Sequence, residues 1–372
     1  MEYLFILGRN PKLSVAEITD YFENLNPINE FCIKKNGMLS IFEKKFPVNT
    51  IKNLGGTIAI GEVLASGSIH EIEKELEKIE VYFGKKNNFN YAVWNFSDES
   101  SYNKILEYLK RRFKDEKFKS SKKNLSGRLQ LQDGGEISIP MSLTEEEYFV
   151  FTKNEKIYFG RIIEKTNYKE IEERDIKKPV RREELAISPR LSKIMINLSQ
   201  VKEGQTLVDP FCGIGGILQE ALLRKIKVIG IDSDSEAISG ARENLLWANF
   251  QKKDFVLFNS DSSKLKINHS DVLVSEPDLG ETLKYSPAKN KAREIINDYE
   301  DLMIKVLNNM KDKISGKIVF TAPYIKLITG ERNGCNVQKI ISQTRLKLHK
   351  DFPIAEFREG QVVGRQIFVL EK

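Results

Sequence analysis

A glycine-rich turn between two apolar segments constrains the fold of this chain more than any other feature of its sequence. Residues 208–216 read Val-Asp-Pro-Phe-Cys-Gly-Ile-Gly-Gly, the segment 205–208 before them is extended and apolar, and the helix-like run Ile-Leu-Gln-Glu-Ala-Leu-Leu follows directly. A second apolar segment, Val-Ile-Gly-Ile-Asp at 228–232, ends in a carboxylate. A strand, a glycine turn, a helix and a second strand predict a βαβ unit that binds a ligand at the carboxyl ends of its parallel strands.

The rest of the second half continues this alternation. The sequence predicts helices over 189–198, 217–225, 235–248 and 292–310, strands over 206–208, 227–231, 255–259, 272–274 and 317–321, and a final strand pair near 352–357 and 366–370. Strands that alternate with helices at this pitch predict an α/β fold, with an open parallel sheet and helices on both faces. We expect this Rossmann-like domain to occupy residues 186–372.

The first half is predicted to be an irregular α+β region. The expected strands are 3–8, 57–65, 90–95, 136–140, 148–152 and 156–163, and the expected helices are 14–22, 69–82 and 101–113. Residues 166–185 are polar and charged, and Pro179 interrupts any regular element there, so we place a linker over this segment.

Composition excludes several classes of protein. A chain of 372 residues that is 40% hydrophobic and 30% charged is typical of two or three soluble domains. No apolar run approaches the roughly 20 residues that span a bilayer, and the N-terminus lacks the basic lead of a signal peptide. The three cysteines and three histidines are scattered, which predicts a cytoplasmic protein without a metal site. A net charge of +6 is compatible with a nucleic-acid partner.

Acidic residues follow three successive predicted strands of the second half. Asp209 precedes the glycine turn, Asp232 follows the next strand, where an acid can bind ribose hydroxyls, and Asp261 follows the third. Glycines at 213, 215 and 216 allow a tight turn and a close approach of the backbone to a ligand. The predicted cofactor contacts are Asp209, Phe211, Cys212, Gly213, Gly215, Gly216, Asp232, Ser233, Asp261 and Ser262.

The sequence leaves three interpretations of this glycine loop open. The order Gly-x-Gly-Gly departs from the dinucleotide pattern Gly-x-Gly-x-x-Gly, and Asp209 would repel a pyrophosphate. The same carboxylate suits the cationic methionine portion of S-adenosylmethionine (SAM), which favours SAM over a nicotinamide cofactor. The third interpretation is a tight turn between strand and helix that binds no ligand.

Four segments carry a resemblance to a known family. They are Asp-Pro-Phe-Cys-Gly-Ile-Gly-Gly at 209–216, Tyr-Leu-Phe-Ile-Leu-Gly-Arg at 3–9, Tyr-Phe-Gly-Arg-Ile at 158–162 with Tyr168 and Arg174-Asp175, and Ile-Ser-Pro-Arg-Leu-Ser-Lys-Ile-Met-Ile-Asn-Leu at 187–198. The chain resembles the class I, SAM-dependent THUMP-domain tRNA guanine-N2-methyltransferases of archaea and eukaryotes, which modify G10 of tRNA.

The resemblance implies a domain order, a cofactor and a substrate. It implies a ferredoxin-like domain over 1–60, a THUMP RNA-binding domain over 61–165, the linker over 166–185 and a methyltransferase domain over 186–372. SAM is the implied cofactor and tRNA the implied partner, with no membrane association. Whether a partner subunit is needed stays open.

The segment that should perform the chemistry departs from the family pattern. Family members end the strand after the adenine-contacting loop in Asp-Pro-Pro-Tyr-Gly, whereas residues 275–280 read Ser-Glu-Pro-Asp-Leu-Gly. With the glycines aligned, Glu276 replaces the catalytic Asp and Pro277 is kept; with the second proline aligned instead, Ser275 takes the place of the acid. Glu276, Pro277 and Ser275 are therefore the catalytic candidates.

Both alignments lose the aromatic ring that stacks on the target base, a contact worth roughly 1–3 kcal/mol. A ring from Tyr285 or Tyr324 is a possible replacement. Three hypotheses follow: an active methyltransferase with a remodelled loop, a methyltransferase with an altered nucleic-acid target, and a SAM- and RNA-binding protein that has lost catalysis.

The most basic stretch of the chain continues the predicted helix 101–113. Its candidate RNA-binding residues are Lys110, Arg111, Arg112, Lys114 and Lys117. Such a stretch is either an electrostatic surface for phosphates or a solvated helix face whose aromatic residues pack inward. The resemblance favours contact with RNA.

Overall fold

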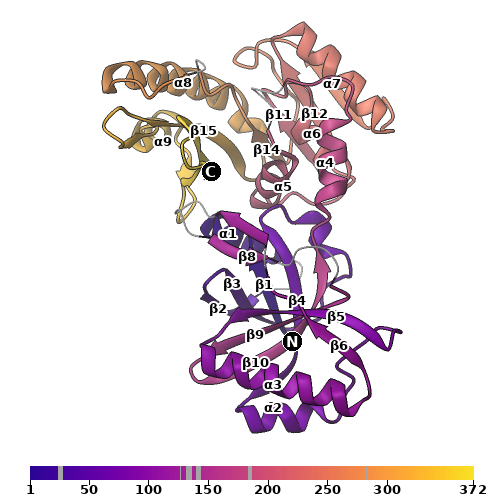
Figure 1. Cartoon of the computed structure of the whole chain (residues 1–372). Helices are drawn as coiled ribbons and strands as arrows, with labels where there is room; N and C mark the ends of the chain where they lie inside the picture. The colour runs from indigo at the N-terminus through magenta and orange to yellow at the C-terminus, as the bar shows by residue number, and fades with distance from the viewer. Residues whose placement is uncertain (24–27, 126, 131–135, 140–143, 183–186, 281–282) are drawn as a thin grey trace. The chain divides into compact units, whose positions relative to one another are not determined.

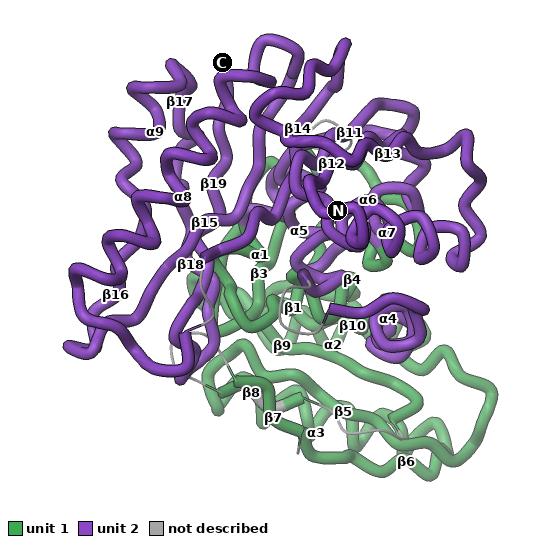
Figure 2. Tube along the Cα trace, turned by 90° about the horizontal axis from the view of Figure 1, so that it is seen from above, with its two compact units in different colours: residues 1–15, 22–52, 56–166 green, residues 16–21, 53–55, 167–372 purple. Residues whose placement is uncertain are grey.

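The computed structural model describes residues 1–23, 28–125, 127–130, 136–139, 144–182, 187–280 and 283–372. The chain forms two compact units, which Figure 2 shows in different colours. Unit 1 comprises residues 1–15, 22–52 and 56–166, and unit 2 comprises residues 16–21, 53–55 and 167–372. Within the described residues, no helix is long and apolar enough to cross a membrane.

Unit 1 is built on an eight-stranded sheet in the order β2-β3-β1-β4-β10-β9-β5-β6. Its strands are β1 (Glu2–Leu7), β2 (Ile28–Lys34), β3 (Gly37–Phe42), β4 (Thr57–Gly67), β5 (Asn88–Phe96), β6 (Lys119–Lys122), β9 (Glu146–Lys153) and β10 (Lys156–Lys165), while β7 (Gly127–Gln130) pairs with β8 (Glu136–Ile139). The helices in this part of the chain are α1 (Pro11–Phe22), α2 (Ile69–Leu76) and α3 (Glu99–Asp115).

Helices α2 and α3 share an apolar core with the sheet, because their buried residues follow the helical period. Ile72 of α2 and Leu109 of α3 are fully buried in one cluster with Tyr148 and Phe159 of the sheet. The long strand β4 pairs with β1 on one side and with β10 on the other. One sheet therefore continues through residue 60, where the sequence analysis expects a domain boundary. The division of this region into a domain over 1–60 and a THUMP domain over 61–165 stays a prediction.

Unit 2 contains a sheet in the order β13-β12-β11-β14-β15-β19-β17. Its elements are α4 (Tyr168–Ile176), α5 (Pro189–Leu198), β11 (Thr206–Asp209), α6 (Gly216–Leu222), β12 (Lys227–Asp232), α7 (Ser235–Trp247), β13 (Phe255–Asn259), β14 (Val272–Ser275), α8 (Lys289–Met310), β15 (Ile318–Lys326), β16 (Arg332–Asn333), α9 (Val337–Thr344), β17 (Lys347–Leu348), β18 (Ile354–Glu356) and β19 (Val363–Glu371). The five strands from β13 to β15 are parallel, as predicted. The sheet is mixed rather than purely parallel, because β19 returns antiparallel beside β15.

Helices cover both faces of this sheet, which confirms the prediction for the second half. A Cβ atom added at Gly230 of β12 would lie 2.6 Å from Leu218 of α6. The next residue, Ile231, is buried in a cluster with residues of α8 such as Tyr299 and Met303. Since successive strand residues face opposite sides, α6 and α8 cover opposite faces, as Figure 1 also shows.

The predicted linker 166–185 is more ordered than its composition suggests. Residues 168–176 form α4, whose first turn is capped by the Asn167 side chain, an acceptor from the Glu170 backbone N–H at 3.2 Å. Arg174 binds Glu170 at 2.9 Å and the buried Glu220 of α6 at 3.2 Å. The sequence analysis predicted no helix within this linker, and the structure adds α4 there, where tertiary ion pairs stabilise a helix whose own residues are polar. Residues 183–186 lie outside the described part.

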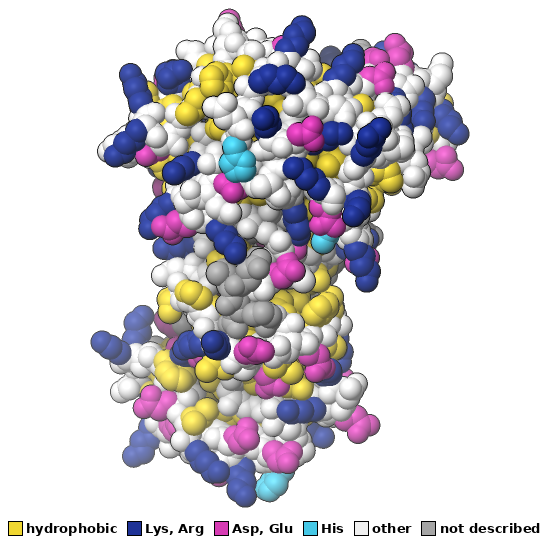
Figure 3. Space-filling model, turned by 180° about the vertical axis from the view of Figure 1, so that it is seen from behind, with side chains coloured by type: hydrophobic (Ala, Val, Ile, Leu, Met, Phe, Trp, Pro, Cys, Tyr) yellow, Lys and Arg dark blue, Asp and Glu magenta, His cyan; other side chains and the backbone are white. Residues whose placement is uncertain are grey.

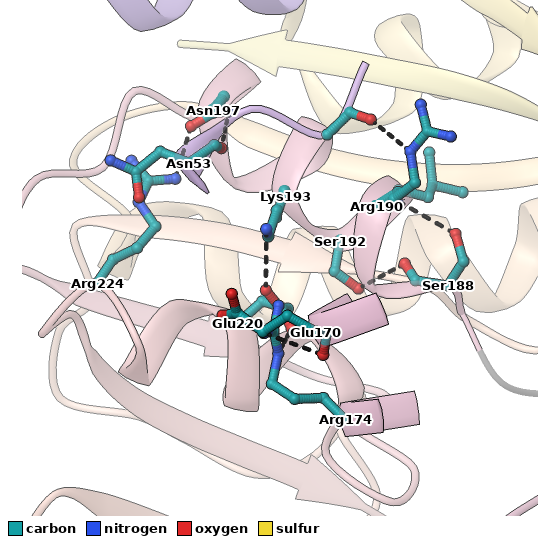
Figure 4. A network of polar contacts seen from close by, with 12 residues as sticks. Asn53, Glu170, Arg174, Ser188, Arg190, Ser192, Lys193, Asn197, Glu220 and Arg224 are labelled. Atoms are coloured by element: carbon teal, nitrogen blue, oxygen red, sulfur yellow. Dashed lines mark hydrogen bonds and ion pairs between the residues drawn. The ribbon is translucent and has the colours of Figure 1, made fainter. Parts of the chain in front are cut away.

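A network of buried polar contacts surrounds α5 (Figure 4). The Asn197 side chain donates to Glu17 at 2.7 Å and to the Asn53 carbonyl at 2.8 Å, and it accepts from the Arg224 guanidinium at 2.6 Å. Nearby, Lys193 lies 4.0 Å from Glu220. One amide thus bonds a carboxylate, a carbonyl and a guanidinium in a largely buried environment, so its loss removes three hydrogen bonds at once.

We expect Asn197→Ala to lower the free energy of unfolding by about 2–3 kcal/mol, because buried partners lose their hydrogen bonds. Urea denaturation followed by circular dichroism measures this change. The exposed Asn297 of α8 provides the control, since Asn297→Ala should change stability by no more than about 0.5 kcal/mol. Equal effects of the two substitutions would contradict the importance of this network.

Candidate active site

Asp209 ends β11 and is 1% exposed. Its Oδ1 accepts hydrogen bonds from the Ser275 hydroxyl at 2.5 Å and from the Phe211 backbone N–H at 3.1 Å. Burial raises the pKa of Asp209 to about 7, against the lowering effect of these two hydrogen bonds, and the charges of Asp232 and Glu276 raise it further. A carboxylate in this state favours a neighbouring cation.

The glycine loop requires glycine mainly for its backbone conformation. Gly213 and Gly215 have φ angles of +50° and +86°, and Gly215 is the N-cap residue of α6. A Cβ atom at Gly213 would meet no atom within 4 Å, so open space adjoins this residue. Cys212 is buried beneath the turn, and burial raises the pKa of its thiol, so it packs as a small apolar side chain.

Asp232 connects the glycine loop to the end of β12. Its carboxylate accepts from the backbone N–H of Gly213 at 2.9 Å and from that of Asp234 at 3.0 Å. The adjacent Ser233 is exposed, and its carbonyl accepts from Asn259 at 2.9 Å. Each carboxylate oxygen has two lone pairs, so Asp232 keeps acceptor capacity for a ribose hydroxyl.

The loop after β13 meets the same edge of the sheet. The Ser262 hydroxyl donates to the carbonyl of Pro210 in the glycine loop at 2.5 Å. Asp261 accepts from the hydroxyl and the backbone N–H of Ser263 and pairs with Lys264 at 3.0 Å, and these contacts lower its pKa to about 2. Asp261 is therefore ionised at neutral pH, while Ser262 links two loops of the site.

The three catalytic candidates have different surroundings. Ser275 is fully buried and hydrogen-bonded to Asp209. Glu276, the next residue, is ion-paired with Arg365 of β19 through Oε1, and its Oε2 is buried without a hydrogen-bond partner among the described residues. Burial raises the pKa of Glu276, and Arg365 opposes the rise. Pro277, which follows it, is buried.

These contacts favour Glu276 over Ser275 as the acid of the remodelled segment. Gly280 has a φ of +96°, which supports the alignment on the glycine. Leu279, at the position of the aromatic ring in that alignment, packs against the apolar core. Of the two possible replacements, Tyr285 is 84% exposed, whereas Tyr324 of β15 lies 5.7 Å from the guanidinium of Arg332. The assignment of catalytic residues stays a prediction.

Arg365 was missed by the sequence analysis. It lies 89 residues after Glu276 on a different strand, and no motif spacing connects the two. The antiparallel pairing of β19 with β15 places Arg365 opposite Pro323. The parallel pairing of β15 with β14 places Phe320 beside Ser275, the residue before Glu276.

The candidate RNA-binding residues all belong to unit 1. Lys110, Arg111, Lys114 and Lys117 are exposed at the end of α3, and Arg111 pairs with Glu73 at 3.0 Å. Arg112 differs, because its guanidinium donates to the carbonyls of Leu76 and Ile79 and pairs with Glu116. The aromatic residues Tyr108 and Phe113 pack inward. On the face that Figure 3 shows, basic and acidic side chains are interspersed.

Comparison with known proteins matches part of unit 2 to a methyltransferase domain. Residues 178–309 match the family model of an RMKL-like methyltransferase domain, UPF0020. The crystal structure of TrmN from Thermus thermophilus superposes with a TM-score of 0.53 over 100% of both chains at 15% identity, which shows a shared fold.

Two curated archaeal relatives cover different shares of the chain. A tRNA (guanine(10)-N2)-dimethyltransferase of Pyrococcus abyssi is 24% identical over 330 residues, which is 87% of this chain and 88% of the relative. A probable tRNA (guanine(10)-N2)-dimethyltransferase of Methanothermococcus thermolithotrophicus is 31% identical over 123 residues, which is 31% of this chain and 74% of the relative. The chain belongs to the class I, SAM-dependent tRNA guanine-N2-methyltransferase family.

Proposed function

We propose that this chain transfers a methyl group from SAM to the exocyclic amine (N2) of a guanine in cytoplasmic tRNA, at position 10. The observation that carries the proposal is the pair of buried carboxylates, Asp209 and Glu276, beside a glycine loop at the carboxyl edge of the sheet. Family membership supports the cofactor and the class of substrate.

The residues of this edge fit SAM. The buried Asp209 complements the cationic methionine portion, and the open space beside Gly213 allows close approach of a ligand to the backbone. Asp232 has acceptors for ribose hydroxyls, and Asp261 has an ionised carboxylate for the adenine amine. When bound, SAM supplies a methyl group that its sulfonium has already activated.

The protein's contribution is to hold the target amine and to accept its proton. The Glu276 carboxylate and the Pro277 carbonyl accept hydrogens from the amine, so that the nitrogen lone pair points at the methyl carbon. Transfer forms the nitrogen–carbon bond, breaks the carbon–sulfur bond and releases one amine proton, for which Glu276 is the acceptor. Ser275 supports the site by holding Asp209.

We assign tRNA contact to the THUMP region and to the exposed side of α3. Lys110 and Lys114 of this helix and Lys117 just beyond its end are exposed, while Tyr108 and Phe113 of the same helix are buried. Exposed lysines on a rigid helix suit phosphate groups, which bind by charge and without sequence preference.

The decisive experiment is incubation of the purified protein with unmodified tRNA and radiolabelled SAM, followed by mapping of the labelled nucleotide. We expect label on N2 of the guanine at position 10. Glu276→Gln should reduce the rate by about 10²-fold or more, because the amine loses its proton acceptor. The exposed Glu294→Gln in α8 should leave the rate unchanged. Binding of SAM without transfer to any tRNA would leave only a binding protein.

A second prediction concerns the pH dependence of SAM binding. Since the pKa of Asp209 is raised to about 7 in the protein alone, and the bound cation favours the carboxylate, SAM binding should release a proton near neutral pH. Affinity should fall as the pH drops below 7, by up to about tenfold per pH unit. Calorimetry at pH values about 0.5 unit apart, from about 5.5 to about 8.5, measures how the affinity for SAM depends on pH.

Two aspartate variants serve as controls for this slope. Asp209→Asn should remove the pH dependence, whereas Asp261→Asn should weaken binding and keep it, because Asp261 is ionised throughout this range. A pH-independent affinity in the unmodified protein would contradict the role of Asp209.

A third prediction tests the RNA surface. Replacing Lys110, Lys114 and Lys117 together by Gln should weaken tRNA binding and reduce the slope of log K against log salt by about 0.7–0.9 for each lost phosphate contact. A control variant replaces the exposed Lys252, Lys253 and Lys313 by Gln, which changes the net charge equally. If both variants lower the slope alike, the end of α3 is a solvated face without a specific role.

A further inference from the structure

We propose that Arg365 is a positioning residue for Glu276, which holds one carboxylate oxygen so that the other one accepts hydrogen from the target amine. The inference rests on the proposed function, since it concerns how the same site holds its substrate. It adds a residue that lies outside the glycine loop and outside the segment 275–280.

The two oxygens of Glu276 have different surroundings. Oε1 accepts from Arg365 Nε, whereas Oε2 is buried and has no hydrogen-bond partner in the described part of the chain. The Glu276 and Arg365 side chains are 8% and 23% exposed, so the pair is largely shielded from water. A buried carboxylate oxygen without a donor is unfavourable, and an amine hydrogen placed beside it would satisfy it.

The strands place the arginine on a rigid part of the fold. Arg365 lies opposite Pro323 in the ladder between β19 and β15, and β15 in turn pairs with β14, which ends at Ser275. The guanidinium therefore reaches across one strand to meet Glu276. A side chain held by a sheet positions its partner more accurately than one on a loop.

The replacement of Asp by Glu explains why such support is needed. Glutamate has one more rotatable bond than aspartate, so its carboxylate samples more positions unless a neighbour fixes it. A misplacement of about 1 Å at a reacting group can reduce the rate by about 10²-fold. Arg365 removes this freedom at Oε1 and leaves Oε2 as the available acceptor.

The charged and titratable groups around Glu276 come from three elements. Arg365 of β19 favours the ionised form, whereas Asp209 of β11 carries the same charge when ionised. Tyr299 of α8 is buried, its hydroxyl donates to the Thr321 carbonyl, and it stays neutral because its pKa is raised. Loss of Arg365 therefore raises the pKa of Glu276, and the carboxylate that accepts the amine hydrogen persists only at higher pH.

Single-turnover methyl transfer at saturating SAM and tRNA tests the positioning role. We expect Arg365→Met to lower the rate by about 10²-fold, Arg365→Lys to restore part of it, and the affinities for SAM and tRNA to stay unchanged. The acid limb of the pH–rate profile should move upward by at least about one unit in Arg365→Met. Arg358→Met, in the exposed part of the same hairpin, is the matched control and should behave as the unmodified protein.

A measurement without substrate tests the ion pair separately. In Arg365→Met the unpaired Glu276 binds a proton more tightly when folded than when unfolded, so stability should fall more steeply than in the unmodified protein as the pH rises from 4.5 to 7. Adding Glu276→Gln should abolish the extra slope. Because both variants are compared by urea denaturation, a partly destabilised protein still gives a result.

The outcomes separate this inference from the proposed function. Transfer by the unmodified protein together with an unchanged rate and profile in Arg365→Met would overturn the positioning role and leave the methyltransferase in place. Absence of transfer in the unmodified protein would overturn both, even if the stability measurements show the ion pair. Equal loss of activity in Arg358→Met would also overturn the inference, because the effect would then not depend on Glu276.

Discussion

The burial of Asp209 at the end of β11 is the constraint on which the rest of the site depends. Its carboxylate accepts from Ser275 at 2.5 Å, which joins the ends of two neighbouring parallel strands, β11 and β14. Burial, followed by the charges of Asp232 and Glu276, raises its pKa to about 7, so the protein alone carries less negative charge here than its composition suggests. A cationic ligand reverses this, because it stabilises the ionised form. Under the proposed function, cofactor binding and proton release are therefore one coupled equilibrium.

The loops around Asp209 are held by their own side chains. Asp232 binds the backbone of Gly213, and the Ser262 hydroxyl binds the carbonyl of Pro210. These hydrogen bonds connect the ends of β12 and β13 to the glycine loop and leave the space beside Gly213 open. A loop that is already held loses little conformational freedom when a ligand binds, so more of the interaction energy appears as affinity.

Local patterns predicted the second half well, because its strands and helices follow from residue periodicity and glycine placement. The βαβ unit, the helices on both faces and the meeting of Asp209, Asp232 and Asp261 at one edge need no distant partner. Other features have no local signal, because residues distant in the sequence determine them. Helix α4 depends on the ion pair of Arg174 with Glu220, and β19 becomes antiparallel because it returns beside β15. Arg365 has no local signal, since only that ladder brings it to Glu276.

The remodelled segment shows how one position changes the demands on others. Where the family has a short acid and an aromatic ring, this chain has Glu276 and Leu279. Leu279 packs against the apolar core, and Tyr285, one possible source of the missing ring, is 84% exposed. In the positioning role that we propose, Arg365 fixes this longer acid. If Arg365 and Glu276 work as a pair, Glu276→Asp should fail to improve the enzyme, because the shorter side chain falls out of reach of Arg365 Nε while the neighbouring residues remain adapted to glutamate.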